Sequence, residues 1–353
     1  MLRTRVFRVT RFVGFVSIAL ALAIPVGAQT LPPVSIGAGM RSSFAHTEPD
    51  GPTEGTDEFL LDSVRLYVNG SVTDKIKIMF NTEYNGSQND VEVLDAAGQL
   101  AFSPKFNIWF GRFLPPSDRA NLYGPYYAHH WAVYTDGVQD GYPFIFQGRA
   151  NGAMYWGQFG KVKVSGGAFD GKSLNGDDTV MGAGRVQVDF WDAEGGYYLN
   201  GTYYGDKNLL AIGAAGQVQG EDKSAYSVDF LMERKLPGGA AATIEAEWAK
   251  YDRLGGYSGS YGTDDGGYVL GAYLFPKMSG PGQWEVLGKF GKARFREGLT
   301  LLDLDYDQKT TEVDFNYVLK QFNARVMIFY LDTRFDAVRT NVKKFGVGLQ
   351  LQM

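Results

Sequence analysis

The stretch FLLDSVRLYVNGSV, residues 59–72, shows most clearly how this chain folds, because apolar and polar side chains alternate along it. The even positions Leu60, Val64, Leu66, Val68 and Val72 carry apolar side chains, and the odd positions from 63 to 71 carry polar ones. After a turn at Thr73-Asp74, the segment KIKIMFNTEYN (75–85) repeats the alternation. A period of two is typical of a β-strand with two different faces, and each segment has the roughly 9–11 residues that a tilted strand needs to cross a bilayer. We therefore predict a hairpin with one apolar and one polar face.

The same alternation recurs from residue 34 to the end of the sequence. If the Tyr-rich stretch 192–208 is an irregular connection, the strand count is 16, an even number as in single-chain bacterial barrels. A further strand at 196–204 would make the count odd. We therefore predict an all-β fold, a transmembrane antiparallel β-barrel of about 16 strands. The predicted strands are 34–44, 59–72, 75–85, 91–102, 106–113, 142–156, 161–170, 179–191, 209–219, 224–233, 240–251, 266–275, 282–296, 306–319, 322–333 and 342–353.

Residues 1–28 have the pattern of a secretory signal peptide. Four arginines precede an apolar core at 12–24, and the small residues Val26-Gly27-Ala28 are suited to cleavage. The apolar core is shorter than the roughly 20 residues of a membrane-spanning helix. We therefore predict export, and a mature barrel domain at 29–353 that resides in the outer membrane.

The composition narrows the class of protein further. Removal of residues 1–28 takes away four of the 34 Lys and Arg and none of the 39 Asp and Glu, so the net charge falls from −5 to −9. An acidic chain is a poor partner for nucleic acid or for an anionic membrane surface. With no Cys there is no disulfide framework, and 46 Gly, 21 Tyr and 24 Phe are typical of a barrel whose lipid-facing and lumen-facing side chains alternate.

Two segments resemble the phosphate-selective porin O/P family of bacterial outer-membrane channels: FLLDSVRLYVNGSVTDKIKIMFNTEYNG (59–86) and FNIWFGRFLPPSD (106–118). In the second, a strand ending in Gly-Arg-Phe leads through Pro to the third long loop. The resemblance implies a 16-stranded barrel, usually a homotrimer, with this loop folded into the lumen. It also implies passive diffusion of small hydrophilic solutes or ions, phosphate-type anions among them. Phosphate-selective members line the channel with a dense basic ladder, which this chain matches only by scattered Arg and Lys.

The phase of the alternation predicts which charged side chains line the pore. An Arg or Lys that faces lipid at the midplane costs about 2–4 kcal/mol, so charges on the strands should point into the lumen. Basic residues dominate the first half of the wall and acidic residues the second half, which predicts a transverse field that favours small polar or dipolar solutes. The predicted pore-lining residues are Arg65, Lys75, Lys77, Glu83, Arg149, Lys161, Lys163, Arg185, Glu245, Glu247, Glu285, Glu312 and Asp314, with Asp229, Glu233, Lys289 and Arg325 on the same faces.

The loop 114–141 is the predicted constriction, because a long loop in a compact fold usually has a function and this one is rich in aromatic residues. Its rings could narrow the pore, stack on sugar rings, or belong to an aromatic girdle or subunit contact. Adjacent His129 and His130 lack a third ligand at a suitable spacing, so we expect no metal site. The predicted constriction residues are Asp118, Arg119, Tyr123, Tyr126, Tyr127, His129, His130 and Trp131.

Two other classes of protein are alternatives to a porin. A carbohydrate-selective channel would use the loop aromatics, and an outer-membrane barrel enzyme would need a His beside a Ser, whereas all three His fall in predicted loops. A secreted β-rich adhesin would show the same strand alternation but would fractionate as a soluble protein. We favour a porin without catalytic residues or cofactors, whose partners are outer-membrane lipid, small hydrophilic solutes or ions and two further copies of itself, and not nucleic acid.

Overall fold

The computed structural model describes residues 33–85, 89–133, 148–172, 178–254, 261–277, 280–298, 304–336 and 339–353. The predicted signal peptide, the end of the predicted constriction loop at 134–141 and the start of the predicted strand at 142–147 lie outside these residues. The fold described below is that of the unit from residue 33 onward.

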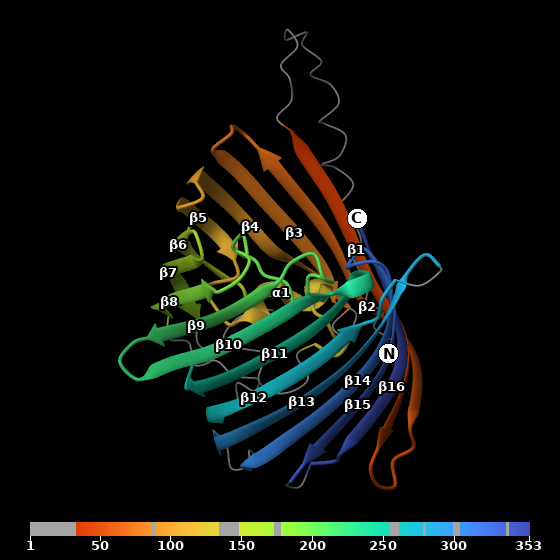
Figure 1. Ribbon diagram of the computed structural model, residues 1–353. Coiled ribbons are helices and arrows are strands. Elements are labelled where there is room, and N and C mark those ends of the chain that lie inside the picture. The colour runs from red at the N-terminus through yellow and green to blue at the C-terminus, as the bar shows by residue number, and fades with distance from the viewer. Residues whose placement is uncertain are drawn as a thin grey trace, which may run out of the picture. The chain divides into compact units, whose positions relative to one another are not determined.

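Sixteen antiparallel strands form one closed barrel in the described part of the chain (Figure 1). Each strand pairs with its neighbours in the sequence, and β1 closes the barrel on β16, where Met40 lies opposite Leu351. The strands are β1 Val34–Pro49, β2 Thr56–Ser71, β3 Ile76–Asn85, β4 Asp90–Ser103, β5 Phe106–Phe113, β6 Ala150–Phe159, β7 Val162–Lys172, β8 Asp178–Asp189, β9 Leu209–Gln219, β10 Lys223–Leu236, β11 Ala240–Asp252, β12 Tyr261–Leu274, β13 Gln283–Gly298, β14 Tyr306–Lys320, β15 Ala324–Phe335 and β16 Val342–Gln352.

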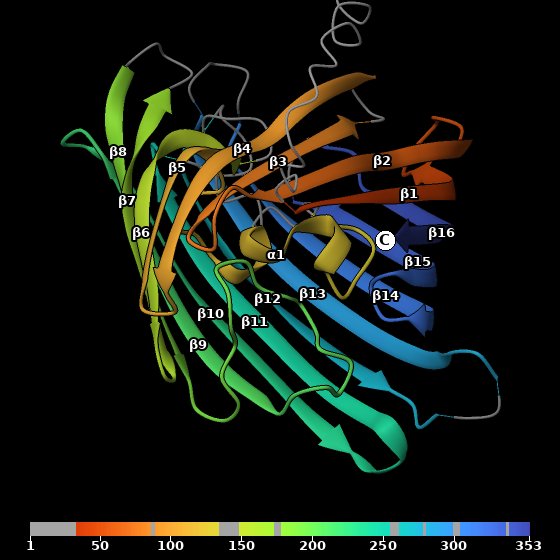
Figure 2. The same ribbon diagram turned by 90° about the horizontal axis from the view of Figure 1, so that it is seen from above.

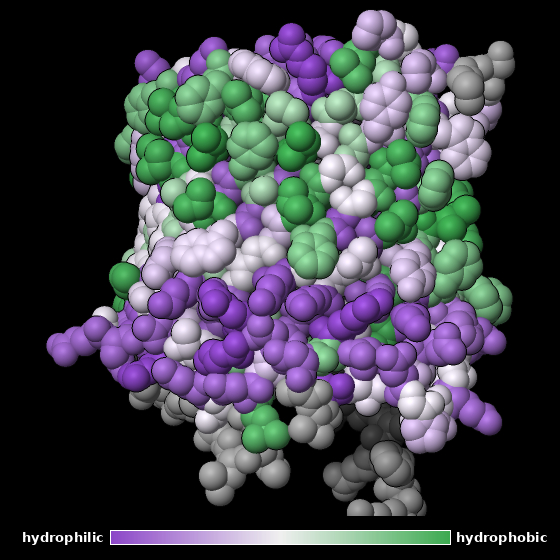
Figure 3. All heavy atoms as spheres, turned by 60° about the horizontal axis from the view of Figure 1, so that its bottom comes forward, coloured by the Kyte–Doolittle hydropathy of each residue, from purple (hydrophilic) through white to green (hydrophobic). Residues whose placement is uncertain are grey.

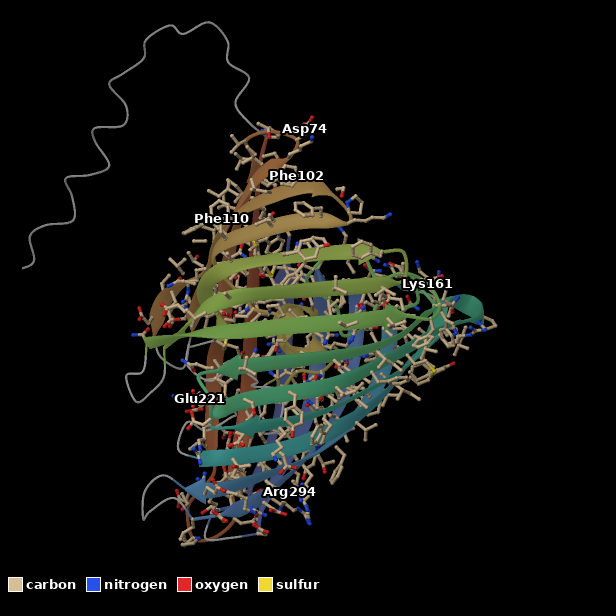
Figure 4. All side chains as sticks on the ribbon, turned by 90° about the vertical axis from the view of Figure 1, so that its left-hand side faces the viewer. Asp74, Phe102, Phe110, Lys161, Glu221 and Arg294 are labelled. Carbon is tan, nitrogen blue, oxygen red and sulfur yellow. The ribbon has the colours of Figure 1, made fainter. Side chains whose placement is uncertain are left out.

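The predicted fold class and strand count are confirmed, and so is the interpretation of the Tyr-rich stretch as a connection. Residues 190–208 join β8 to β9 without a strand of their own. We call the end of the barrel that carries the short β6–β7 turn the short-turn end. The connection begins at this end, because the backbone N–H of Asp189 donates to the carbonyl of Lys161 in the β6–β7 turn (2.7 Å). Figure 4 shows Lys161 at one end of the barrel and Glu221, in the β9–β10 turn, at the other.

The two faces of the wall differ as the alternation predicts. Outward-facing side chains at mid-strand are apolar and about half exposed, such as Val228, Val269 and Phe290 at 48%, 49% and 48%. Figure 3 shows a hydrophobic zone above a band of polar residues on the outer surface. The opposite parity of the same strands carries buried polar and charged side chains, such as Asp229 and Lys289. The wall is therefore apolar outside and polar inside.

The interior holds a short helix that the sequence did not predict. Helix α1, Arg119–Tyr127, lies inside the ring of strands (Figure 2). Its first turn forms because the carboxylate of Asp118 accepts from the backbone N–H of Asn121 (2.8 Å), which satisfies a free donor at the helix N-terminus. Gly124, at φ 61°, interrupts it just before Pro125. A helix this short and broken has no apolar periodicity to read, which is why a loop was expected here.

Small remaining elements do not change the architecture. A 3-10 turn, Pro237–Gly239, joins β10 to β11. In the described ranges, no helix has both the length and the apolar character to cross a membrane.

Candidate channel site

Most of the predicted pore-lining side chains are buried within the barrel. Apart from Arg149, which immediately precedes β6, they come from the inward parity of β2, β3, β7, β8, β11, β13 and β14, whose neighbours on the other parity are exposed or partly exposed on the outer wall. These residues are Arg65, Glu83, Arg149, Lys163, Arg185, Glu245, Glu247, Glu285, Glu312 and Asp314. Their part in lining a channel stays a prediction, and the contacts below show what they do in the fold.

Three predicted pore-lining lysines lie elsewhere. Lys75 belongs to the β2–β3 turn, because Val72 and Thr73 donate to the carbonyl of Ile76 (2.8 and 3.1 Å) and end the ladder there. Lys161 is exposed in the β6–β7 turn, where its ammonium donates to the carbonyl of Phe190 (2.8 Å). The predictions for both lysines as strand residues are therefore wrong.

The third of these lysines, Lys77, has the predicted phase but not the predicted depth. It shares the inward parity of Met79 and Asn81 on β3 but is exposed beside the turn. Lys77 can therefore line the pore only at the barrel mouth.

Three of the buried arginines in the first half of the barrel are paired with carboxylates. Arg65 lies opposite Glu83 across β2 and β3, and their charged groups are 2.9 Å apart. Arg149 lies 3.4 Å from Asp95, and the guanidinium of Arg185 forms two hydrogen bonds to Asp229. Of these carboxylates, Asp95 was missed from the sequence. The signal that could have found it is the pairing of β4 with β3, which places it opposite Asn81 on the inward parity.

The inward-folded third loop is held on the acidic half of the wall. At its start, the backbone N–H of Arg119 donates to Asp229 (3.2 Å). One helical turn later, the hydroxyl of Tyr123 donates to Glu245 (2.9 Å), which also accepts from Tyr268 (2.7 Å). Burial and the nearby negative charge of Glu245 raise the pKa of Tyr123, so this phenol remains a donor.

The segment after the helix continues along the same wall. His129 Nε2 lies 2.6 Å from Glu285, the backbone N–H of Trp131 donates to Asp314 (2.9 Å), and that of Ala132 donates to Glu312 (2.7 Å). Three predicted pore-lining carboxylates therefore bind the loop. Since an unpaired buried carboxylate is costly, these contacts both seat the loop and satisfy the wall.

Glycines in the facing strands leave room for the rings of the loop. A Cβ on Gly348 would stand 2.5 Å from the indole of Trp131, and one on Gly39 would stand 2.6 Å from the ring of Tyr126. The Trp131 ring stacks on the Phe329 ring, with 5.6 Å between the two centroids. The guanidinium of Arg41 lies 4.1 Å from the centroid of the Trp131 ring. The constriction residues are buried, with the exception of Tyr127, which is 37% exposed.

The β8–β9 connection forms a second insert, which enters from the opposite end. We call residues 190–208 the short-turn insert. Its Glu194 accepts two hydrogen bonds from the guanidinium of Arg119, at 2.9 and 2.7 Å, and both side chains are fully buried. Tyr203 and Gln187 donate to the same carboxylate, at 2.5 and 2.6 Å. Burial alone would raise the pKa of Glu194, but the charge and hydrogen bonds of Arg119 outweigh it and lower it to about 2.

A second carboxylate fastens this insert to the wall. Glu233 on β10 accepts from the hydroxyl of Thr202 (2.7 Å) and from the backbone N–H groups of Tyr203 (2.8 Å) and Gly205 (2.7 Å). The two inserts thus meet inside the barrel and are joined by Arg119 and Glu194. Sequence reasoning found the length of the short-turn insert but not its position, because nothing in its composition says to which side it folds.

Between the inserts and the short-turn end of the barrel lies a cavity of about 750 Å³. Its wall contains four tyrosines, Tyr67, Tyr123, Tyr127 and Tyr198, and many side-chain amides. The amides are those of Asn69, Asn81, Asn121, Asn200, Gln321, Asn323 and Gln352. The charged side chains on this wall are Arg65, Arg149 and Asp95, each in an ion pair. We call this space the short-turn cavity.

Comparison with known proteins shows which fold this is. No family model and no curated protein sequence matches the chain. The solved structure of OprB from Pseudomonas putida covers 91% of this chain and 94% of its own, with a TM-score of 0.63 and 8% identity. The anion-selective porin from Comamonas acidovorans covers 91% and 99%, with a TM-score of 0.59 and 14% identity. The chain has the outer-membrane porin fold.

A third similar structure adds an assembly. The trimer form of OmpT, an outer membrane protein of Vibrio cholerae, covers 91% of this chain and 99% of its own, with a TM-score of 0.54 and 13% identity. At these identities the likeness concerns the barrel, and the inserts of this chain have to be interpreted from their own contacts. Membership of the phosphate-selective porin O/P family stays a prediction.

The contact of His129 with Glu285 predicts a pH dependence of loop docking. Burial lowers the pKa of His129, but Glu285, at 2.6 Å, and the more distant Glu233 and Glu245 raise it above its ordinary value of 6.5. The stabilisation by the imidazolium is therefore complete below pH 6.5 and is lost as the pH rises through the raised pKa of the folded protein. A charge-assisted hydrogen bond contributes about 1.5–3 kcal/mol.

We expect single-channel current to become noisier, or conductance to rise, as the pH increases above about 6.5, the ordinary pKa of His. Recordings in planar bilayers between pH 6 and pH 10 would measure this. The matched control is His129→Gln, whose side chain cannot be protonated and which should abolish the change of current with pH. A wild-type profile identical to that of His129→Gln would contradict the prediction.

Proposed function

We propose that this chain is an outer-membrane porin through which small hydrophilic solutes or ions diffuse passively. One observation carries the proposal: a closed barrel of 16 strands with an apolar outer belt and a charged interior into which the third loop folds. A closed barrel is one of the two structures that can span lipid, because every backbone polar group is paired within the wall. The charged interior suits water and not lipid.

Planar-bilayer recording of the purified, detergent-extracted protein tests the proposal. We expect stepwise, ohmic current increments in KCl, and recovery of the protein from outer membranes rather than from the soluble periplasm. Boiled protein is the control for detergent leakage. Recovery in the soluble fraction, or membranes that stay electrically silent with folded protein present, would overturn it.

We also propose that the barrel works as a homotrimer and without catalysis. The trimer form of a protein with the same fold supports the first part. In support of the second part, the ring of His129 in the third loop contacts the carboxylate of Glu285. This ring therefore positions the loop. In the described residues no cluster of three or more His, Asp or Glu side chains is arranged to hold a metal.

Ion preference depends on how the lumen charges are used. The carboxylates Asp229, Glu285, Glu312 and Asp314 hold the third loop, so the acidic half of the wall is covered. We therefore propose weak ion preference in place of the strong anion selectivity that the family resemblance implies. A reversal potential measured across a tenfold KCl gradient would check this, and a value near the ideal anion limit would contradict it.

The short-turn cavity favours a second candidate, passage of uncharged carbohydrates. Its tyrosine rings offer faces on which sugars stack, and its amides offer donors and acceptors for hydroxyl groups. In the described residues, the hydroxyl of Tyr67 and the amide oxygen of Asn81 are buried there without a hydrogen-bond partner. Since the arginines on this wall are paired, the cavity offers little excess charge to an anion.

Current block by sugars distinguishes this candidate from a non-selective pore. We expect maltose or sucrose to reduce single-channel current at millimolar concentrations, and Tyr127→Ala to weaken that block several-fold with little change in KCl conductance. Tyr226→Ala, which removes an outward-facing ring, is the matched control. Equal block of wild type and Tyr127→Ala would refute sugar binding while leaving the porin proposal intact.

A further inference from the structure

Every connection at the short-turn end of the barrel carries a lysine. The sixteen strands make seven connections at this end, from β2–β3 to β14–β15. In each, a Lys lies in the connection itself or in the last two residues of the strand before it. We call these seven residues the lysine collar, and they are Lys75, Lys105, Lys161, Lys207, Lys235, Lys277 and Lys320. Lys207 is partly exposed and the other six are exposed.

The contacts of the lysine collar do not neutralise its charge. Among the described residues, none of the seven lysines forms an ion pair. Lys161 and Lys207 donate to the backbone carbonyls of Phe190 (2.8 Å) and Ala193 (3.1 Å), which carry no net charge. The exposed carboxylates in the same connections are those of Asp74, Asp192 and Asp206. Positive charge is therefore in excess at this end.

The opposite, long-loop end has the other sign where the structure describes it. The β9–β10 turn carries Glu221 and Asp222, and the β1–β2 connection carries Asp50 and Glu54, all of them exposed. Figure 4 shows Glu221 and Lys161 at opposite ends of the strands. The whole chain has a net charge of −5, so the collar is a local reversal of sign.

Three cations at the short-turn end border the lumen. Lys77 on β3 and Lys235 on β10 have the inward parity, and Lys235 lies opposite the buried Ala241. β3 and β10 are seven strands apart in a ring of sixteen, so the two lysines flank the mouth from nearly opposite sides. Lys207 belongs to the short-turn insert, where its ammonium lies 4.9 Å from the ring centroid of Tyr203. We call Lys77, Lys207 and Lys235 the mouth lysines.

The charges behind the mouth leave these lysines as the field that an entering ion meets. Arg65 and Arg149 on the wall of the short-turn cavity are each in an ion pair. Charges of one sign around a mouth with a low-dielectric wall raise the local concentration of counter-ions by about tenfold or more. The attraction increases with the number of charges on the ion, so multivalent anions are concentrated most.

We propose that the mouth lysines and the lysine collar collect small multivalent anions at the short-turn mouth. The inference rests on the proposed porin function and adds a class of solute and a side to it. Short turns of outer-membrane barrels face the periplasm, so the anions are collected from that side. Monovalent K⁺ and Cl⁻ are affected least, which agrees with the weak ion preference proposed above.

Block of single channels by inorganic tripolyphosphate tests the proposal. The recordings use bilayers of uncharged lipid in about 0.1 M KCl, where the screening length is about 10 Å. We expect half-block from the short-turn side at a concentration about tenfold lower than from the long-loop side. In about 1 M KCl, where the screening length falls to about 3 Å, the difference between the sides should disappear.

Two lysine variants identify the source of the field. Lys77→Gln/Lys207→Gln/Lys235→Gln should lose the difference between the two sides. Lys75→Gln/Lys105→Gln/Lys277→Gln, which changes exposed turns and leaves the short-turn insert untouched, should reduce it. The matched control is Lys250→Gln/Lys309→Gln/Arg334→Gln, which removes the same charge from the outward parity of β11, β14 and β15 and should block as wild type.

The orientation of the channel is read from Glu221→Cys. The chain has no other Cys, so a bulky maleimide labels this variant only from the compartment that the long-loop end faces. Equal block from both sides of a conducting channel, or a difference that persists in both lysine variants, overturns the inference and leaves the porin proposal intact. Folded protein that gives no current in KCl overturns the porin proposal itself.

Discussion

Arg119→Ala is expected to release both inserts and to give the largest rise in single-channel conductance of any single substitution in the lumen. The guanidinium forms two hydrogen bonds to Glu194, and both groups are fully buried. Removal of one partner leaves a buried carboxylate uncompensated, which costs about 3–5 kcal/mol. The backbone N–H of Arg119 also anchors the third loop at Asp229. The substitution therefore removes the ion pair at the place where the third loop meets the short-turn insert.

Conductance in planar bilayers and the protease sensitivity of the short-turn insert measure this effect together. Arg253→Ala is the matched control, because its ion pair with Asp222 is exposed at both ends (55% and 60%) and such pairs contribute about 0–1 kcal/mol. The double variant Arg119→Met/Glu194→Gln should recover part of the loss, since it leaves no unpaired charge. Wild-type conductance and an insert still protected from protease in Arg119→Ala would show that the ion pair does not hold the inserts.

Glu233→Ala is expected to free the short-turn insert alone. Its carboxylate accepts from one hydroxyl and two backbone N–H groups of the insert, at 2.7–2.8 Å. Each buried donor left without an acceptor costs about 1–3 kcal/mol, so the insert should lose at least about 3 kcal/mol of docking energy. Because the insert forms one wall of the short-turn cavity through Tyr198, Leu199 and Asn200, the cavity should open to the bulk.

The expected readouts are higher conductance and a loss of sugar block, with the pH dependence of His129 retained because the third loop stays seated. Glu221→Ala, an exposed residue of the β9–β10 turn, is the control. A variant with unchanged conductance and unchanged sugar block would show that the insert is held by its apolar contacts, Leu199 and Tyr197, and not by Glu233.

Local alternation was sufficient for the wall of the barrel. In β5 and β9 the predicted and observed bounds agree, at 106–113 and 209–219, and in the other strands they differ where pairing ends earlier or later than alternation does. Lys75 and Lys161 were misplaced for this reason. Alternation continues through a tight turn, whereas the hydrogen-bond ladder does not.

The sequence by itself determined the closed antiparallel barrel, its even strand count, and the inward parity of most charged strand residues, because each follows from a period of two read locally along the chain. Only the tertiary structure decided what the inward side chains do. The partners of Glu194, Glu233 and Glu285 lie 75, 30 and 156 residues away, so no local pattern joins them. Buried charges have to find partners at whatever sequence distance the fold offers, and here they bind two inserts and not open water.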